Sequence, residues 1–361
     1  MTSADQTTSA WDADAFRASV QSTLDDFVDA QALRLAELGP DADLLVTAAR
    51  QALSGGKRFR AAFCYWGFRA AHEEEYDEQR LLRAAAALEI LHASALVHDD
   101  FMDASDTRRG RPATHRAFEQ THRESGWGGD PEQYGAAAAI LLGDLLLSWA
   151  DELLRSCGFD EAQVLDALGY FDTTRSEVIA GQFLDVSVQA RRASDVEAAM
   201  TVLRYKSAKY SVERPLHIGA ALAGASPEVF AALSDFGLPL GEAFQLRDDL
   251  LGVFGDPEVT GKPAGDDLVE GKRTVLVALT LEHAPEERAA HLDERLGTQL
   301  DAAEVDTLRA IIEESGAHAR VESMIDELTS RCLGALDAAP VTVSARAVLR
   351  DLAAAATQRA L

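Results

Sequence analysis

The 361-residue sequence predicts an all-α fold, and three observations support this fold class. Apolar side chains recur with helical spacing through long segments rich in alanine and leucine. Glycine and proline gather mainly in a few connecting segments. Strand patterns are scarce, because the most strand-like run, residues 274–280, fits a helix better. We therefore expect a bundle of roughly ten or more helices.

Start and stop signals delimit the predicted helices. The first long segment ends at the breaker "RRGRP", the second stops near Gly158, and Ser226 before Pro227 has the residue types of a helix N-terminus. The predicted helical segments span residues 77–103, 136–156, 160–190, 195–224 and 226–256. The fourth segment could form one helix or two.

The chain has the organisation expected of one domain over residues 13–361. No Pro/Ser-rich linker and no repeat of solenoid period divides it. Residues 1–12 are rich in Ser, Thr and Asp and predict a disordered lead-in. They lack the basic and apolar pattern of a secretory signal.

Composition excludes some classes of function. A net charge of −26 argues against nucleic acid, because a phosphate backbone requires a basic surface. The excess acid fits either salt adaptation or a surface kept soluble by self-repulsion. The three cysteines are far apart and predict a reducing, cytoplasmic environment. The apolar run from Gly135 is interrupted by Asp144, so we expect no membrane-spanning segment.

Four acidic residues and three arginines crowd the stretch "LVHDDFMDASDTRRGRPATH", residues 96–115. Asp99 and Asp103 are four residues apart, so a helix places them on one face, with Asp100 beside them. A second cluster, "FQLRDDLLGVFGD", contains Asp248 and Asp249 one turn after Gln245. Two carboxylate pairs on separate helices suit Mg²⁺, which takes oxygen ligands and bridges to phosphate.

The few lysines lie near segments that suit anions. Only five of the 34 basic residues are lysines, and arginine and lysine are not interchangeable. Lys57 follows two glycines in "GGKRFR", which is not a Walker A loop because it lacks that spacing. Together these segments predict positive pockets for a phosphorylated small molecule. The lysines are Lys57, Lys206, Lys209, Lys262 and Lys272.

The motifs "GGKRFR", "LEILHASALVHDDFMDASDTRRGRPATH", "GQFLD", "YKSAKY" and "FQLRDDLLGVFGDPEVTGKPAGDDLVEGKRT" resemble those of the trans-isoprenyl diphosphate synthases, or polyprenyl synthetases. They stand in the family's order between about residues 50 and 280. The resemblance implies an all-α isoprenoid-synthase bundle with a central cavity, forming a homodimer. It implies a prenyltransferase that condenses isopentenyl diphosphate with an allylic diphosphate (dimethylallyl, geranyl or farnesyl). It also implies a cluster of Mg²⁺ ions, about three per site, which Mn²⁺ can replace.

The resemblance assigns roles to residues of both clusters and of the basic segments. Metal ligands and catalytic groups would be Asp99, Asp100, Asp103, Asp248 and Asp249, with Lys206 as a further catalytic group. Isopentenyl diphosphate would bind Lys57, Arg60, His92 and Arg109. The allylic diphosphate would bind Arg108, Lys206 and Lys262, with Ser207 and Lys272 nearby. Gln182, Asp185 and Gln245 would line the cavity.

Two features bear on specificity. Gly252 stands where the family often has the third acid of the second motif, which puts one metal contact in doubt but leaves Asp248 and Asp249. Product length depends on the side chains that the prenyl tail passes, and the resemblance places Ser94 and Ala95 there. Small side chains favour geranylgeranyl diphosphate over farnesyl diphosphate. A side chain deeper in the cavity, such as Phe118 or Trp149, could instead limit the tail.

Other interpretations remain open at this point. A farnesyl or longer-chain polyprenyl synthase would share all of these motifs. A class I terpene cyclase would share the first aspartate motif but needs no second diphosphate site, so "GGKRFR" argues against it. A catalytically silent partner subunit of a prenyl synthase is a different class, and the intact aspartate pairs argue against it.

Overall fold

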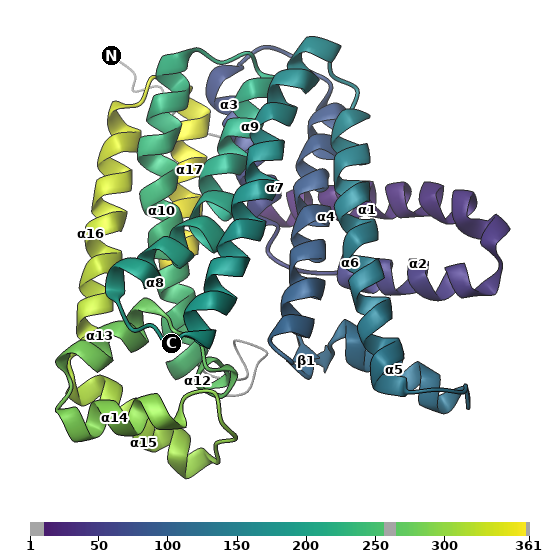
Figure 1. Cartoon of the computed structure of the whole chain (residues 1–361). Helices are drawn as coiled ribbons and strands as arrows, with labels where there is room; N and C mark the ends of the chain where they lie inside the picture. The colour runs from purple at the N-terminus through teal and green to yellow at the C-terminus, as the bar shows by residue number, and fades with distance from the viewer. Residues whose placement is uncertain (1–10, 256–264, 359–361) are drawn as a thin grey trace.

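The computed structural model describes residues 11–255 and 265–358, and within these ranges the chain is almost entirely helical (Figure 1). The predicted all-α fold class is therefore confirmed. The helices of the N-terminal half are α1 (Ala13–Leu35), η1 (Ala36–Leu38), α2 (Pro40–Ala52), α3 (Phe59–Ala71), α4 (Glu78–Met102), α5 (Thr114–Glu124), α6 (Pro131–Arg155) and α7 (Glu161–Ala190). The later helices are α8 (Val196–Val202), η2 (Leu203–Glu213), α9 (Arg214–Leu222), α10 (Pro227–Phe254), α12 (Asp266–Glu270), α13 (Val275–His283), α14 (Glu286–Arg295), α15 (Ala302–Glu314), α16 (Ala317–Ala338) and α17 (Val343–Thr357).

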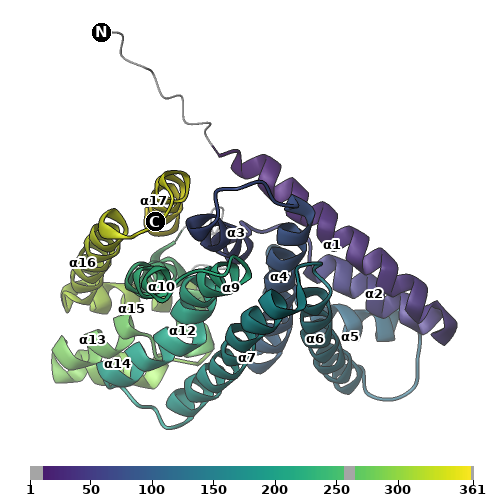
Figure 2. The same cartoon turned by 90° about the horizontal axis from the view of Figure 1, so that it is seen from above.

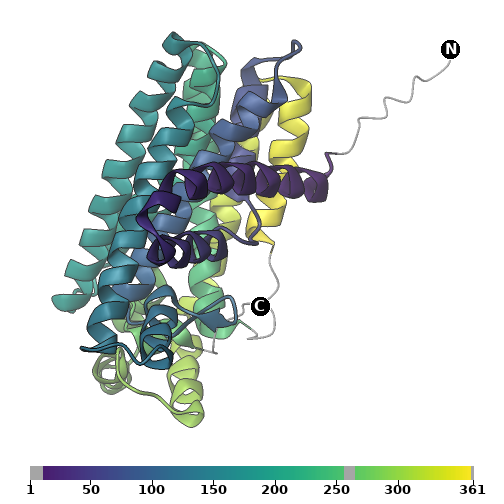
Figure 3. The same cartoon turned by 90° about the vertical axis from the view of Figure 1, so that its right-hand side faces the viewer.

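The long helices stand side by side, and α4 lies among them (Figure 2). It packs against α3 and α6, and α3 packs in turn against α9. Helices α1 and α2 cross the outside of this bundle at a steep angle, as Figures 1 and 3 show. The short helices α12–α15 gather at the end of the bundle where α4 terminates (Figure 1). That end holds the polar residues described below.

Helix starts follow local side-chain chemistry. The carboxylate of Asp12 accepts hydrogen bonds from the backbone N–H groups of Asp14 and Ala15, at 3.0 and 2.9 Å. Asp77 caps α4 in the same way through Gln79 N. The predicted N-cap Ser226 is at the start of α10, with Pro227 as the first helical residue, but its side chain makes no capping bond.

Helix α4 is the most buried of the long helices near the site. By length and composition it could cross a membrane, but 72% of its apolar window is buried inside the protein. That burial is typical of a core helix. The run from Gly135 that stood out in the sequence forms part of α6.

Two elements were not predicted. Thr107–Arg108 and Arg111–Pro112 form a short antiparallel hairpin, β1 and β2, in the arginine-rich segment. Residues Leu203–Glu213 form a π-helical segment, η2, inside the region predicted to hold one or two helices. Run 274–280 lies in helix α13, as expected.

The hydrophobic core consists of two clusters of buried side chains. The larger one joins α1, α3, α4, α6, α7 and α9, and the smaller one lies between η2 and α13–α16. Helix α10 contributes Phe236 and Leu240 to the first cluster, and Leu246 and Leu250 to the second. The division into one domain and a lead-in stays a prediction, and residues 1–10 of that lead-in lie outside the described residues.

Candidate active site

Aspartates from both clusters line one cavity of about 780 Å³. Asp99 reaches it from α4, and Asp248 and Asp249 reach it from α10. Apolar side chains from α4, α7 and α10, including Leu96, Val178 and Phe244, form part of the wall. The convergence expected from the sequence is therefore present in the fold.

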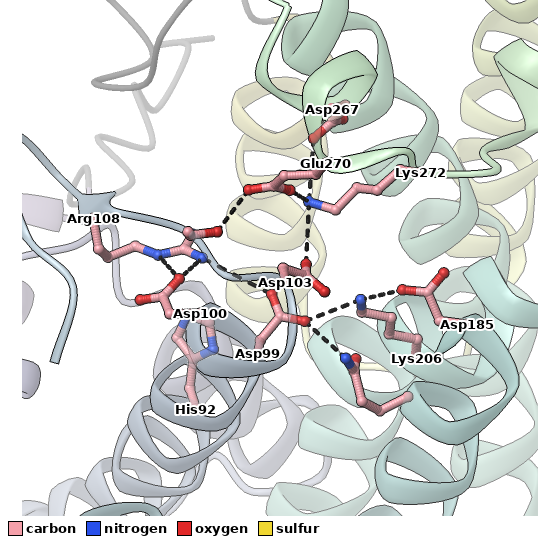
Figure 4. Close-up of polar contacts among 12 residues, drawn as sticks. His92, Asp99, Asp100, Asp103, Arg108, Asp185, Lys206, Asp267, Glu270 and Lys272 are labelled. Atoms are coloured by element: carbon pink, nitrogen blue, oxygen red, sulfur yellow. Dashed lines mark hydrogen bonds and ion pairs between the residues drawn. The ribbon is translucent and has the colours of Figure 1, made fainter. Parts of the chain in front are cut away.

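Asp99 is held by a network of polar groups (Figure 4). Its Oδ1 accepts hydrogen bonds from Lys206 Nζ at 3.1 Å and from Gln182 Nε2 at 3.0 Å. Lys206 also donates to Asp185 Oδ2 at 2.5 Å. Burial alone would raise the pKa of Asp99, but the positive charges of Lys206 and Lys272 outweigh it and lower that pKa. Asp99 is therefore an anion at neutral pH.

Lysine 206 reaches Asp99 because two glycines let η2 come close to its neighbours. A Cβ atom on Gly181 of α7 would lie 2.4 Å from Lys206 N, and one on Gly241 of α10 would lie 2.4 Å from Ala208 O. Any larger residue would push η2 away from these helices. Ser207, in the same π-helical segment, also lines the cavity.

Asp103, one turn after Asp99, lies 3.7 Å from Lys272 Nζ through its Oδ2. Lys272 also pairs with Asp267 at 3.2 Å and with Glu270 (Figure 4). Burial and the charge of Asp99 raise the pKa of Asp103. Asp103 is therefore a carboxylate with a raised pKa beside the ion-paired Asp99.

Asp100 faces a different direction from Asp99. Its Oδ1 accepts a hydrogen bond from Arg108 Nε at 2.8 Å, and the carboxylate lines a second cavity of about 460 Å³ rather than the larger one. Arg108 lines both cavities and lies 3.9 Å from Asp99 Oδ2. In this arrangement Asp100 orients Arg108, and its predicted role as a metal ligand stays a prediction.

The second cluster contains one buried aspartate, Asp249. Asp249 is 7% exposed and accepts a hydrogen bond from Gln245 Nε2 at 2.8 Å. Burial raises the pKa of Asp249 to about 8, and the nearby carboxylates of Asp267 and Asp248 raise it as well. A nearby cation would stabilise the ionised form of this carboxyl group.

Asp267 was not singled out from the sequence. It lines the cavity with Asp248 and Asp249, and its side chain is only 12% exposed. The aspartate lies between Lys262 and Lys272, the residues for which the sequence singled out this segment. Lys262 itself lies outside the described residues.

The glycine-containing loop before α3 presents cations with different environments. Arg58 has a left-handed backbone with φ of 55° and is 5% exposed. It forms an ion pair with buried Glu89 at 3.3 Å, and Glu89 also accepts from Ala61 N at 3.1 Å. Lys57 is exposed at the cavity rim. Arg58 therefore anchors the loop, while Lys57 faces the solvent side of the cavity.

His92, Arg60 and Tyr210 also line the larger cavity. His92 Nδ1 lies 2.7 Å from the Tyr210 hydroxyl, and the Arg60 guanidinium lies 4.2 Å from the centre of the Tyr210 ring. Burial lowers the pKa of His92, and the charges of Arg60 and Arg109 lower it further. His92 is therefore a neutral imidazole that can take part in hydrogen bonds without adding charge.

Arg109 occupies the tip of the β1–β2 hairpin. It has a left-handed backbone with φ of 54°, and its Nη1 donates to the carbonyl of Ser54 at 2.8 Å. Gly56 has a φ of 94°, which favours glycine, and an added Cβ atom would lie 3.0 Å from Arg109 Nη2.

The two proposed length-determining residues point in different directions. Ala95 lines the larger cavity. Ser94 is buried, and its hydroxyl donates to the carbonyl of Gly143 in α6 at 2.7 Å. Phe118 lines the smaller cavity, and Trp149 packs against Phe27 in the core.

The donor set fits a divalent cation that also binds phosphate. Across residues 11–255 and 265–358, no group of three or more His, Cys, Asp or Glu side chains is arranged to hold a metal by itself. Mg²⁺ commonly completes its coordination with water and phosphate oxygens. Asp103 and Asp249, whose pKa values are raised by burial and by neighbouring carboxylates, match such an incomplete set of protein ligands.

Comparison with known proteins agrees with this geometry. A family model described as polyprenyl synthetase matches residues 42–314. The crystal structure of geranylgeranyl pyrophosphate synthase from Corynebacterium glutamicum, complexed with isoprenyl diphosphate and magnesium, superposes with a TM-score of 0.94. It is 42% identical and covers 97% of this chain and 100% of its own.

The curated relatives include two further synthases. A short chain isoprenyl diphosphate synthase of Methanothermobacter thermautotrophicus is 34% identical over 68% of this chain and 69% of its own length. A geranylgeranyl diphosphate synthase of Methanosarcina mazei is 37% identical over 62% of this chain and 63% of its own length. The chain belongs to the polyprenyl synthetase family and is a trans-prenyltransferase.

Proposed function

We propose that this protein condenses isopentenyl diphosphate with an allylic diphosphate and that geranylgeranyl diphosphate is its product. The observation that carries the proposal is the single cavity that Asp99, Asp248 and Asp249 line together with Lys57 and Lys206. The relatives named for geranylgeranyl diphosphate synthesis support the product. Farnesyl diphosphate and longer chains are the alternatives.

The residues of the cavity have complementary tasks in this reaction. Lys206 and Arg108, both beside Asp99, would receive the negative charge that develops on the leaving allylic diphosphate. When bound, Mg²⁺ supplies further positive charge that stabilises this leaving group. Lys57, Arg60, His92 and Arg109 would hold the second diphosphate. Apolar walls near Leu96 and Phe244 would exclude water from the allylic cation.

The proposal includes Mg²⁺ ions bound between the two aspartate clusters. We infer that Asp99 and Asp103 on one side, and Asp248 and Asp249 on the other, bind about three Mg²⁺ ions together with diphosphate, and that Mn²⁺ can replace them.

Helices α6 and α7, which contact each other, expose large apolar side chains that support a homodimer. They include Ile140, Leu141, Ile179, Phe183 and Val186. The cytoplasm is the proposed location, on the basis of three cysteines that are free and buried.

The purified chain tests the proposed reaction. Incubation with Mg²⁺, isopentenyl diphosphate and each labelled allylic starter should give elongated products, which chromatography identifies by length. Asp99→Asn should abolish turnover and leave the helical circular dichroism unchanged. A folded wild-type chain that gives no elongated product would support the silent-subunit alternative.

Product length has its own test. Ala95→Phe places a bulky ring in the larger cavity and should shift the product towards farnesyl diphosphate. Ser94→Phe should instead disturb packing of α4 against α6, because Ser94 contacts the Gly143 backbone. An unchanged product from a folded Ala95→Phe variant would rule out this path for the tail.

A further inference from the structure

The two aspartate clusters differ at one position. In α4, Asp103 follows Asp99 by four residues and lies on the same helix face. In α10, the residue four positions after Asp248 is Gly252, so this helix lacks a carboxylate there. On the face of α10 that carries Asp248, no side chain of this helix therefore fills the space at position 252.

That room is filled by a carboxylate from another segment. A Cβ atom built on Gly252 would lie 1.9 Å from Asp267 Oδ2 and 2.4 Å from its Cγ. Real Cβ atoms do not approach other atoms so closely. The carboxylate of Asp267 therefore occupies the space into which a side chain at position 252 would project.

Asp267 is fixed in this place by its own segment. It belongs to the short helix α12, and its backbone carbonyl accepts a hydrogen bond from Lys272 N at 3.0 Å. Its Oδ1 accepts from Lys272 Nζ at 3.2 Å, and the same ammonium lies 3.7 Å from Asp103 (Figure 4). Asp267 is thus linked through one lysine to the first cluster while it contacts the second.

We propose that Asp267 supplies the carboxylate that α10 lacks at position 252, and so completes the second metal-binding cluster from a different helix. Gly252 is required because any side chain would displace that carboxylate. This inference rests on the proposed function, since it concerns the same Mg²⁺–diphosphate site. It identifies a carboxylate of the metal site, that of Asp267, which the sequence pattern alone does not indicate.

A purely structural role for Asp267 makes a different prediction. If Asp267 only positioned Lys272, its loss would weaken diphosphate binding by the same factor at every Mg²⁺ concentration. If Asp267 serves the metal, its loss should raise the Mg²⁺ concentration required for binding, and saturating Mg²⁺ should restore the affinity. The Mg²⁺ concentration that gives half-maximal binding, called the Mg²⁺ midpoint, therefore separates the two roles.

The experiment measures binding of inorganic pyrophosphate by calorimetry across a Mg²⁺ titration, with thermal unfolding as a check on the fold. The variants are Asp267→Asn, Asp267→Ala, Gly252→Asp and the double variant Gly252→Asp/Asp267→Ala. Asp267→Asn keeps the size and an acceptor for Lys272 but removes the charge. Loss of a residue that supports a metal ligand typically weakens metal affinity roughly 10–100-fold, and loss of a carboxylate that serves the metal should cost at least as much.

We expect both single changes at Asp267 to raise the Mg²⁺ midpoint by about that factor. Gly252→Asp alone should lower the melting temperature because of the clash. The double variant, which moves the carboxylate to α10, should recover both the melting temperature and the midpoint. Folded Asp267 variants with a wild-type midpoint, or a folded double variant no better than Asp267→Ala, would overturn the inference alone. A wild-type chain that binds pyrophosphate without regard to Mg²⁺ would overturn the proposed function as well.

Discussion

Arg58 and Lys57 are adjacent cations in the loop before α3, but their burial assigns them different roles. Arg58 is buried with Glu89, whereas Lys57 is exposed. Arg58→Ala should lower the free energy of unfolding by about 3–5 kcal/mol, because it leaves Glu89 as a buried unpaired charge. Lys57→Ala should change the unfolding free energy by less than about 0.5 kcal/mol.

Steady-state kinetics and urea unfolding of the two variants check this division. Lys57→Ala should raise KM for isopentenyl diphosphate, because the lysine lies at the cavity rim. Equal losses of stability in both variants would contradict the assignment of Arg58 as the anchor.

His217 predicts a dependence of stability on pH. It is 4% exposed, and its Nε2 lies 2.9 Å from the Ser234 hydroxyl. Burial lowers the pKa of His217 to about 4, and the charge of Arg214 also lowers it. The unfolded chain, with a histidine pKa near 6.5, binds more protons between these values, so stability should fall as pH drops from 6.5 towards 4.

The size of this effect is up to about 3 kcal/mol, since each pKa unit corresponds to about 1.4 kcal/mol. Urea unfolding at several pH values, compared between the wild type and His217→Gln, isolates the contribution. The glutamine variant should have a smaller slope in this range. An identical slope would mean that His217 is not buried as a neutral ring.

At the scale of elements, the close approach of α7 and η2 positions Lys206. Gly181→Ala would place a Cβ 2.4 Å from Lys206 N, a backbone atom that cannot move alone. We expect a loss of about 1–3 kcal/mol in unfolding free energy together with reduced turnover. Gly169→Ala, on the same helix, has no atom within 4 Å of its added Cβ and is the matched control.

The control should be neutral or stabilise the protein by up to about 1 kcal/mol, because alanine favours a helix over glycine. Urea unfolding and kcat measure both variants. Similar effects of the two substitutions would show that the η2 contact does not position Lys206.

Helical periodicity predicted the long helices because it arises within each segment. The run 77–103 became α4, Glu78–Met102, almost without change. Periodicity could not predict the π-helical geometry of η2, which depends on close packing against Gly181 and Gly241 from other helices. The β1–β2 hairpin was also missed, since it has only two residues in each strand.

The same limit applies to the candidate site. Spacing predicted that Asp99 and Asp103 share a face, and the motif order indicated the partners Asp248 and Asp249. It could not show that Asp100 turns towards Arg108, that Ser94 bonds to α6, or that Asp267 fills the space at Gly252. Each of these depends on a contact between residues of different elements.

At the scale of the whole molecule, the apolar face of α6 and α7 predicts self-association. Phe183 is 71% exposed and Leu141 is 63% exposed, which is costly for a monomer. Light scattering should give twice the chain mass of 38.8 kDa for the wild type. The double variant Leu141→Asp/Phe183→Asp should give the mass of one chain, whereas Leu33→Asp on α1, at a residue 79% exposed, should not.

The central claim is that carboxylates from α4 and α10 bind one metal–diphosphate assembly. Crystals of the chain grown with Mn²⁺ and inorganic pyrophosphate, with anomalous scattering recorded for manganese, test it most directly. We predict anomalous peaks beside both Asp99 and Asp248, joined by a single pyrophosphate within the same cavity. Peaks at only one aspartate pair, or a pyrophosphate bound away from both pairs, would contradict the claim.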